Sequence, residues 1–146
     1  MPTARRSRTI AVPAQELWDV IDDPHHLPRW WPRVSRVEDV DEGAFTEVMK
    51  TRKGKLVRAD FRVAARDEVE RKLVWEQLLE GTPFARVLRS AVTEIRLQAG
   101  SAQATEVTIE LRQILNGVSH FGGYMVRRAA RATIGEALDG LERLGG

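Results

Sequence analysis

The chain has 146 residues, of which 42% are hydrophobic and 30% are charged. This length can bury one substantial core, so we expect a single domain spanning residues 1–146. The absence of cysteine excludes disulfides and thiolate chemistry, and the near balance of 23 basic and 21 acidic residues does not favour nucleic acid as a partner. Without a membrane-length apolar run or a signal-peptide pattern, we expect a cytoplasmic protein with no stable membrane insertion.

The first 32 residues predict a strand followed by two short helices. Pro13 can begin a helix without losing a needed amide, and apolar residues recur at helical spacing between positions 17 and 21. Asp23-Pro24 ends this first helix and caps a second one, which ends at Trp30-Trp31-Pro32.

Between positions 34 and 112, apolar and polar residues mostly alternate, which is typical of half-buried strands. We expect one long strand over residues 84–97. Because all the connections are short, neighbouring strands should pair as an antiparallel meander. The turn sequences between the strands are Asp41-Glu42-Gly43, Lys53-Gly54-Lys55, Glu80-Gly81-Thr82-Pro83 and Ala99-Gly100-Ser101.

The periodicity becomes helical again from Ser119 onward and predicts a helix of about six turns. This helix needs a large apolar surface to cover its stripe, and only the concave face of the sheet offers one. We therefore expect an α+β fold, with a curved antiparallel sheet of about seven strands around a long C-terminal helix and two short helices after the first strand. The stripe consists of Val126, Ala130, Ile134, Ala137, Leu138, Leu141 and Leu144.

This order of elements resembles the START/SRPBCC helix-grip superfamily, and within it the polyketide cyclase/dehydrase-like branch. The resemblance covers nearly the whole chain. It implies a deep cavity between the sheet and the C-terminal helix, used across the superfamily to hold lipids, sterols, polyketides and other bulky apolar molecules. The segments that carry the resemblance are Ile10-Ala11-Val12-Pro13, residues 16–24, residues 27–32, Thr105-Glu106-Val107-Thr108-Ile109, and the final helix with Ala137, Leu138 and Leu141.

Inward-facing strand positions are the candidate ligand-binding residues of such a cavity. Gln77 shares a strand face with Leu73 and Leu79, and an amide in this setting binds either a ligand or a backbone group or water. Arg89 would place a cation in the cavity unless a bulge turns it to solvent, and the direction of Glu47 is open. The predicted cavity residues are Trp31, Glu47, Phe61, Trp75, Gln77, Phe84, Arg89, Phe121 and Met125.

Chemical motifs are absent from the sequence. His25, His26 and His120 do not have the spacing of a metal-binding motif. The GxSxG, GxGxxG and Walker A patterns of hydrolases and nucleotide-binding proteins are also missing. We therefore expect no metal and no cofactor, and the sequence assigns no catalytic residue.

We interpret the chain as a domain that binds a hydrophobic small molecule, either a lipid, a polyketide or an aromatic compound, in its central cavity. One alternative is an enzyme of the polyketide cyclase/dehydrase type. A second alternative is a co-chaperone-like or ribosome-associated interaction module that uses Arg58, Arg62 and Arg112 on the outer face of the sheet. Fold alone does not choose between them, and bulky side chains could also fill the cavity. We expect a monomer or a weak homodimer.

Overall fold

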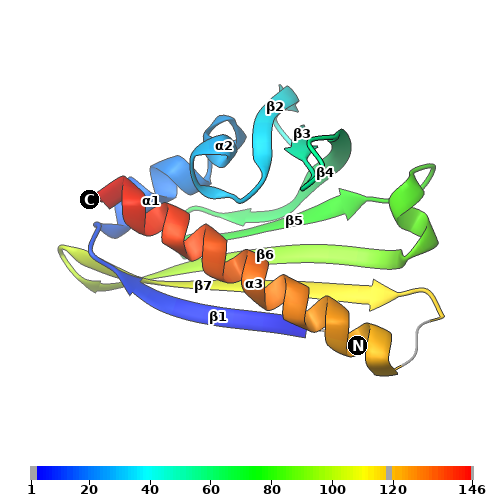
Figure 1. Cartoon of the computed structure of the whole chain (residues 1–146). Coiled ribbons are helices and arrows are strands. Elements are labelled where there is room, and N and C mark those ends of the chain that lie inside the picture. Colours follow the sequence, from blue (N-terminus) through cyan, green and yellow to red (C-terminus); the bar gives the residue numbers. More distant parts are fainter. Residues whose placement is uncertain (1–2, 118–119, 146) are drawn as a thin grey trace.

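The computed structural model of the protein describes residues 3–117 and 120–145, apart from the side chains of His120 and Phe121. Figure 1 shows its strands and helices in chain order. They are β1 (Thr3–Ile10), α1 (Ala14–Ile21), η1 (Pro24–His26), α2 (Leu27–Trp30), β2 (Val34–Asp41), β3 (Ala44–Lys50), β4 (Leu56–Asp67), β5 (Lys72–Leu78), η2 (Pro83–Arg86), β6 (Leu88–Ser101), β7 (Ala104–Leu115) and α3 (His120–Gly145).

The strands form one seven-stranded sheet in the order β1-β7-β6-β5-β4-β3-β2. From β2 to β7 each strand pairs antiparallel with the next, as the short connections predict. The first strand closes the other edge by pairing antiparallel with β7, so that Ile10 lies opposite Thr105. Helix α3 lies along one face of the sheet and packs mainly against β1, β7 and α2 (Figure 1). The predicted α+β helix-grip arrangement is confirmed.

The two helical segments after β1 form where the sequence predicts them. Pro13 is the N-cap of α1, and the apolar face of that helix is buried. Asp23 then caps η1, because its side chain accepts a hydrogen bond of 3.0 Å from the backbone amide of His25. Trp31 follows α2 in an extended conformation, which ends the helix and carries the chain into β2.

Two predicted strand boundaries are wrong. The strand predicted over residues 84–97 begins only at Leu88, because Pro83 opens the short 3-10 helix η2. Proline has a fixed φ and no amide hydrogen, which suits the first position of a helix better than a sheet ladder. The same strand also runs through the predicted turn and ends at Ser101, because a register shift accommodates Gly100.

The long helix α3 has 26 residues, or about seven turns, and the predicted start at Ser119 lies outside the described residues. No described helix, α3 included, is both long and apolar enough to cross a membrane. The predicted stripe faces the sheet, with Val126 and Leu144 half-buried at its ends. Its fully covered members are Ala130, Ile134, Ala137, Leu138 and Leu141.

Candidate functional site

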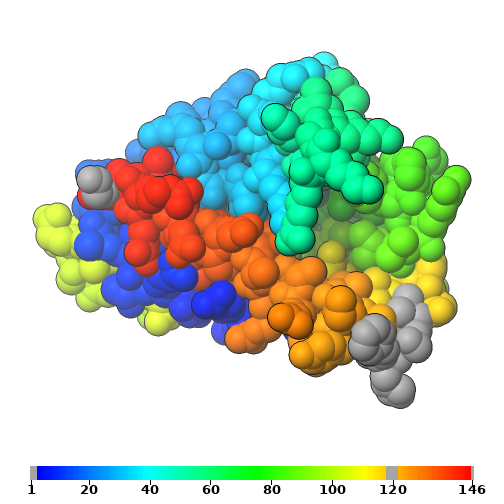
Figure 2. All heavy atoms as spheres, in the orientation of Figure 1, coloured from blue at the N-terminus to red at the C-terminus, as the bar shows by residue number. Residues whose placement is uncertain are grey.

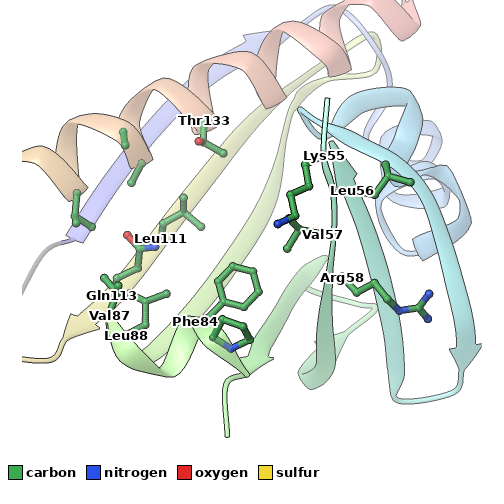
Figure 3. A pocket seen from close by; sticks show the side chains of 14 residues that line it. Lys55, Leu56, Val57, Arg58, Phe84, Val87, Leu88, Leu111, Gln113 and Thr133 are labelled. Carbon is green, nitrogen blue, oxygen red and sulfur yellow. The ribbon is translucent and has the colours of Figure 1, made fainter. Parts of the chain in front are cut away.

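An open apolar groove separates the N-terminal half of α3 from the facing part of the sheet. This outer groove has a volume of about 860 Å³ and is lined by Leu56 and Val57 of β4, Phe84 of η2, and Val126 and Thr133 of α3, among others. Figure 3 shows these walls, with Phe84 and Thr133 on opposite sides. In Figure 2 the surface is hollowed where the loop between β3 and β4 approaches α3. The cavity is therefore open rather than filled by its own side chains.

A smaller chamber of about 140 Å³ adjoins the outer groove along the inner face of the sheet. Leu111 and Gln113 of β7 line both spaces, so the chamber and the outer groove are direct neighbours. The chamber has both aromatic and polar walls. Its aromatic residues are Trp31, Phe61 and Trp75, and its polar residues are Glu47, Gln77, Thr93 and Gln113.

Sheet register brings these chamber residues together from strands that are far apart in sequence. Phe61 of β4 lies opposite Gln77 of β5. Trp75 of β5 lies opposite Thr93 of β6, which in turn lies opposite Leu111 of β7. Side chains at directly opposed positions share one face of a sheet, so this register gathers an inner wall across four strands.

Aromatic rings form a rigid wall on one side of the chamber. The rings of Trp31 and Trp75 meet edge to face, with centroids 5.6 Å apart. Phe45 extends this wall, because its ring stacks on Phe61 at 5.3 Å and meets Trp75 edge to face at 5.9 Å. Such contacts hold side chains in fixed orientations, and their flat surfaces suit a ring-containing or polyene ligand.

Glu47 is the unusual polar group of the chamber. Only 2% of its surface is exposed, and its carboxyl group has no hydrogen-bond or ion-pair partner in the part of the chain that the structure describes. Burial raises the pKa of Glu47 to about 8, because the charged form loses its hydration. A neutral carboxyl group can donate and accept hydrogen bonds, and it can also release or take up a proton. Within the described chain, no three His, Cys, Asp or Glu side chains are grouped to hold a metal ion.

The structure gathers most of the predicted cavity residues in one place. Five of them line the inner chamber, and the side chain of Glu47, whose direction the sequence left open, faces into it. The five are Trp31, Glu47, Phe61, Trp75 and Gln77. One further predicted residue, Phe84 of η2, lines the outer groove.

Two other predicted residues lie outside both spaces. Arg89 is exposed, because the register of β6 against β7 shifts between Leu88 and Ser90 and turns its side chain to solvent. Met125 is 49% exposed on α3, although the next residue along the helix lines the outer groove. The prediction for Phe121 concerns a side chain outside the described residues.

Sequence reasoning missed two polar residues of the chamber, Thr93 and Gln113. Both could have been found from the two-residue period of a strand. Thr93 lies two positions before the buried Ile95, and Gln113 lies two positions after Leu111. The periodicity therefore indicates that both side chains face inward, but only the apolar residues of these two strands were interpreted as inward-facing.

The arginines predicted to serve an interaction surface have acidic partners on the outer side of the sheet. Arg58 contacts Glu38 at 2.6 Å, and Arg62 contacts Glu76 at 2.9 Å. Arg112 contacts Glu110 at 3.0 Å. These ion pairs neutralise the three cations locally, so the described outer face gives no specific support to the interaction-module hypothesis.

Comparison with protein families gives one match over nearly the whole chain. A model of the family described as "Polyketide cyclase / dehydrase and lipid transport" matches residues 1–145. No curated protein is similar enough in sequence to match.

Solved structures share the fold at low sequence identity. The di-domain ARO/CYC BexL from the BE-7585A biosynthetic pathway has 19% identity and a TM-score of 0.84 over 98% of this chain. The match takes in 46% of BexL, so this chain spans about half of that protein. The Zhui aromatase/cyclase from Streptomyces sp. R1128 has 17% identity and a TM-score of 0.69, with 97% of this chain and 88% of that chain covered.

A START superfamily protein from Mycobacterium smegmatis has the same architecture. It has 13% identity and a TM-score of 0.77, with 96% of this chain and 94% of that chain covered. At such identities these likenesses establish a common fold, and the chemistry must be argued from the cavity itself.

Proposed function

Because this chain belongs to the polyketide cyclase/dehydrase and lipid transport family, we propose that it binds a hydrophobic small molecule, a lipid, a polyketide or an aromatic compound, between the sheet and α3. The observation that carries this proposal is the outer groove of about 860 Å³ and the chamber that adjoins it. Pockets for small molecules usually have volumes of about 300–1,000 Å³ and mainly apolar walls.

Unsatisfied apolar surface at the groove explains why its ligand should be hydrophobic. Leu56 and Val87 line the groove and remain 51% and 54% exposed. Each Å² of apolar surface that a ligand removes from water contributes about 25 cal/mol to the free energy of binding. A hydrophobic ligand would therefore bury its own apolar surface and that of the rim in one step.

Blocking the groove tests this function. N-phenyl-1-naphthylamine, a neutral fluorescent probe, should bind the wild-type protein. Ala129→Trp places a bulky ring in the groove, and it should weaken probe binding at least about tenfold, a loss of about 1.4 kcal/mol. Ala132→Trp adds the same ring to an exposed position of α3 outside the groove and should leave affinity unchanged. Equal affinity in all three proteins, or no binding to any, would contradict the proposal.

A second candidate function is catalysis of the cyclase/dehydrase type, and Glu47 is the observation that favours it. A buried carboxyl group beside a bound polyketide could hold or move a proton at a carbonyl or hydroxyl oxygen. Glu47→Gln should then abolish turnover of a polyketide substrate that still binds, whereas a carrier would show a change of affinity alone. The exposed Arg89→Gln variant serves as the control for both measurements.

A further inference from the structure

We infer that the inner chamber receives the polar end of the ligand, and that Glu47 selects a neutral oxygen function there, a ketone or a hydroxyl, over a carboxylate or an ammonium group. This inference rests on the proposed binding function and names the head group that the bound molecule carries. It also assigns Glu47 a role in recognition that does not require any reaction.

Glu47 is buried without a hydrogen-bond partner among the described residues. Polar groups inside proteins almost always have hydrogen-bond partners. The carboxyl of Glu47 has none within the described chain, yet it lines a chamber that lies next to the outer groove. Its cross-strand neighbours are Ala59 of β4 and Val37 of β2, and neither side chain can form a hydrogen bond with the carboxyl group. A group entering the chamber would supply the missing partner.

The other polar walls of the chamber are neutral. Gln77 of β5, Thr93 of β6 and Gln113 of β7 can each donate and accept hydrogen bonds. Among the described residues that line the chamber, Glu47 is the only one with a titratable or charged side chain. A ligand carboxylate would therefore meet no cation there, and its charge would be repelled by an ionised Glu47.

Cations of this cavity lie in the outer groove instead. Lys55, just before β4, and Arg58, near the start of β4, both line that space, but Arg58 is paired with Glu38 at 2.6 Å. In Figure 3 the guanidinium of Arg58 points away from Phe84 and the groove interior. Lys55 is therefore the cation that an anionic substituent at the outer end of the ligand would meet, and the neutral end would enter the chamber.

Chamber size sets how much of the ligand enters. An apolar cavity of about 150 Å³ holds a benzene ring, and the chamber measures about 140 Å³. It can therefore take a head group with one ring, while the rest of the molecule occupies the outer groove.

Protonation of Glu47 gives the selection a direction in pH. Burial raises the pKa of Glu47, so the neutral carboxyl group dominates at pH 6 and can donate a hydrogen bond to a ketone. Ionisation at higher pH removes this donor, so ketone affinity should fall as pH rises. An ammonium head group would respond in the opposite way, because it needs the carboxylate.

Four naphthalenes of similar shape test the inference. They are 2-acetylnaphthalene, 2-ethylnaphthalene, 2-naphthoate and 2-naphthylmethylamine, titrated against the quenching of tryptophan fluorescence, since Trp31 and Trp75 line the chamber. The ketone should bind at least about tenfold more tightly than 2-naphthoate at pH 7. Its affinity should fall about tenfold between pH 6 and pH 9, whereas the affinity of 2-ethylnaphthalene should stay constant.

Two variants attribute these effects to Glu47. Glu47→Gln keeps a donor, so it should retain ketone affinity and lose the pH dependence. Glu47→Leu should weaken ketone binding about tenfold and leave 2-ethylnaphthalene binding intact, which also reports that the variant is folded.

Three results would overturn the inference. Equal, pH-independent binding of ketone and hydrocarbon would remove the head-group selection and leave the proposed binding function standing. Tightest binding of the amine, or of 2-naphthoate, would assign the chamber to an ionic head group. Binding of none of the four would count against the proposed function as well.

Discussion

The two halves of α3 face the same sheet but cover very different interiors. Toward the C-terminus, Ile134, Leu138 and Leu141 are completely buried. Toward the N-terminus, Val126 and Thr133 line an open groove. One helix therefore serves two purposes, since its C-terminal half stabilises the fold and its N-terminal half forms a wall of the site.

Different covering elements explain this contrast. At the packed end, α1 and α2 contribute Trp18 and Trp30. Both side chains are buried, and their indole N–H groups have no hydrogen-bond partner among the described residues. At the open end the cover consists of the loop before β4 and the short η2, which leave the groove between themselves and α3. The packed end therefore consists of tightly packed apolar side chains, whereas the polar residues that could contact a ligand lie at the open end.

The largest expected effect concerns the open end and is a dependence of stability on pH. The folded-state pKa of Glu47 is about 8, above the ordinary 4.5, so the folded protein holds a proton that the unfolded chain releases. Stability from this group is complete below about pH 4.5, falls as pH rises, and is lost above about pH 8. The change amounts to at most about 5 kcal/mol.

Urea unfolding at pH 5 and pH 9 measures this change. Glu47→Gln should remove it, so the variant gains stability relative to wild type as pH rises. Glu106→Gln, which alters an exposed carboxylate of β7, should keep the wild-type profile. Parallel profiles for wild type and Glu47→Gln would mean that the open end is not sensitive to this buried carboxyl.

A cavity-creating substitution compares the two halves of α3 directly. Leu138→Ala removes a fully buried side chain at the packed end and should lower the free energy of unfolding by about 3 kcal/mol. Val126→Ala at the half-buried open end should cost less than about 1 kcal/mol, because its side chain already borders open space. Similar losses in urea unfolding experiments would refute the contrast between the halves.

Close helix packing provides a smaller test at the packed end. A Cβ at Gly140 would lie 2.8 Å from the Cα of Trp30 and overlap its carbonyl oxygen. Gly140→Ala should therefore destabilise the protein by about 2 kcal/mol, despite the better helix propensity of alanine. Gly135→Ala meets only the flexible side chain of Arg6 and should be nearly neutral. Thermal unfolding of the two variants checks this, and equal losses would show that backbone proximity is not the cause.

The smallest effect is expected for an ion pair at the rim of the packed end. Arg66 donates hydrogen bonds to the carboxylate of Asp22 and lies over the ring of Trp18, 5.9 Å from its centroid. Because the side chain of Arg66 is 43% exposed to solvent, which screens the pair, Arg66→Ala should cost less than about 1 kcal/mol in urea unfolding. Arg62→Ala, which breaks another exposed pair, is the matched control. A loss above about 2 kcal/mol for Arg66→Ala alone would show that this ion pair, and not only apolar packing, stabilises the packed end.

Sequence patterns predicted the scaffold because its signals are local. The alternation of β4, the turn at Glu42-Gly43 and the helical stripe ending at Leu144 each depend on neighbouring residues, and all three agree with the structure. The 3-10 helix at Pro83 was missed because a proline marks a break in a strand without specifying the conformation of the next residues.

Orientation inside the site was harder to predict. In β3, Phe45, Thr46, Glu47 and Val48 are all buried, so alternation could not show which face of the strand turns toward the cavity. The exposure of Arg89 depends on a register shift that only pairing with β7 reveals. Met125 and its neighbour Val126 differ by one helical step of about 100°, which separates solvent from the groove.

The most direct test of ligand binding at the open end is NMR detection of contacts between bound 2-acetylnaphthalene and the methyl groups of ¹³C-labelled protein. A ligand in the outer groove should give intermolecular NOEs to Leu111, Val126 and Thr133, and none to Leu138 or Leu141. Saturable binding with NOEs confined to exposed methyl groups such as those of Val69, or no binding at all, would contradict it.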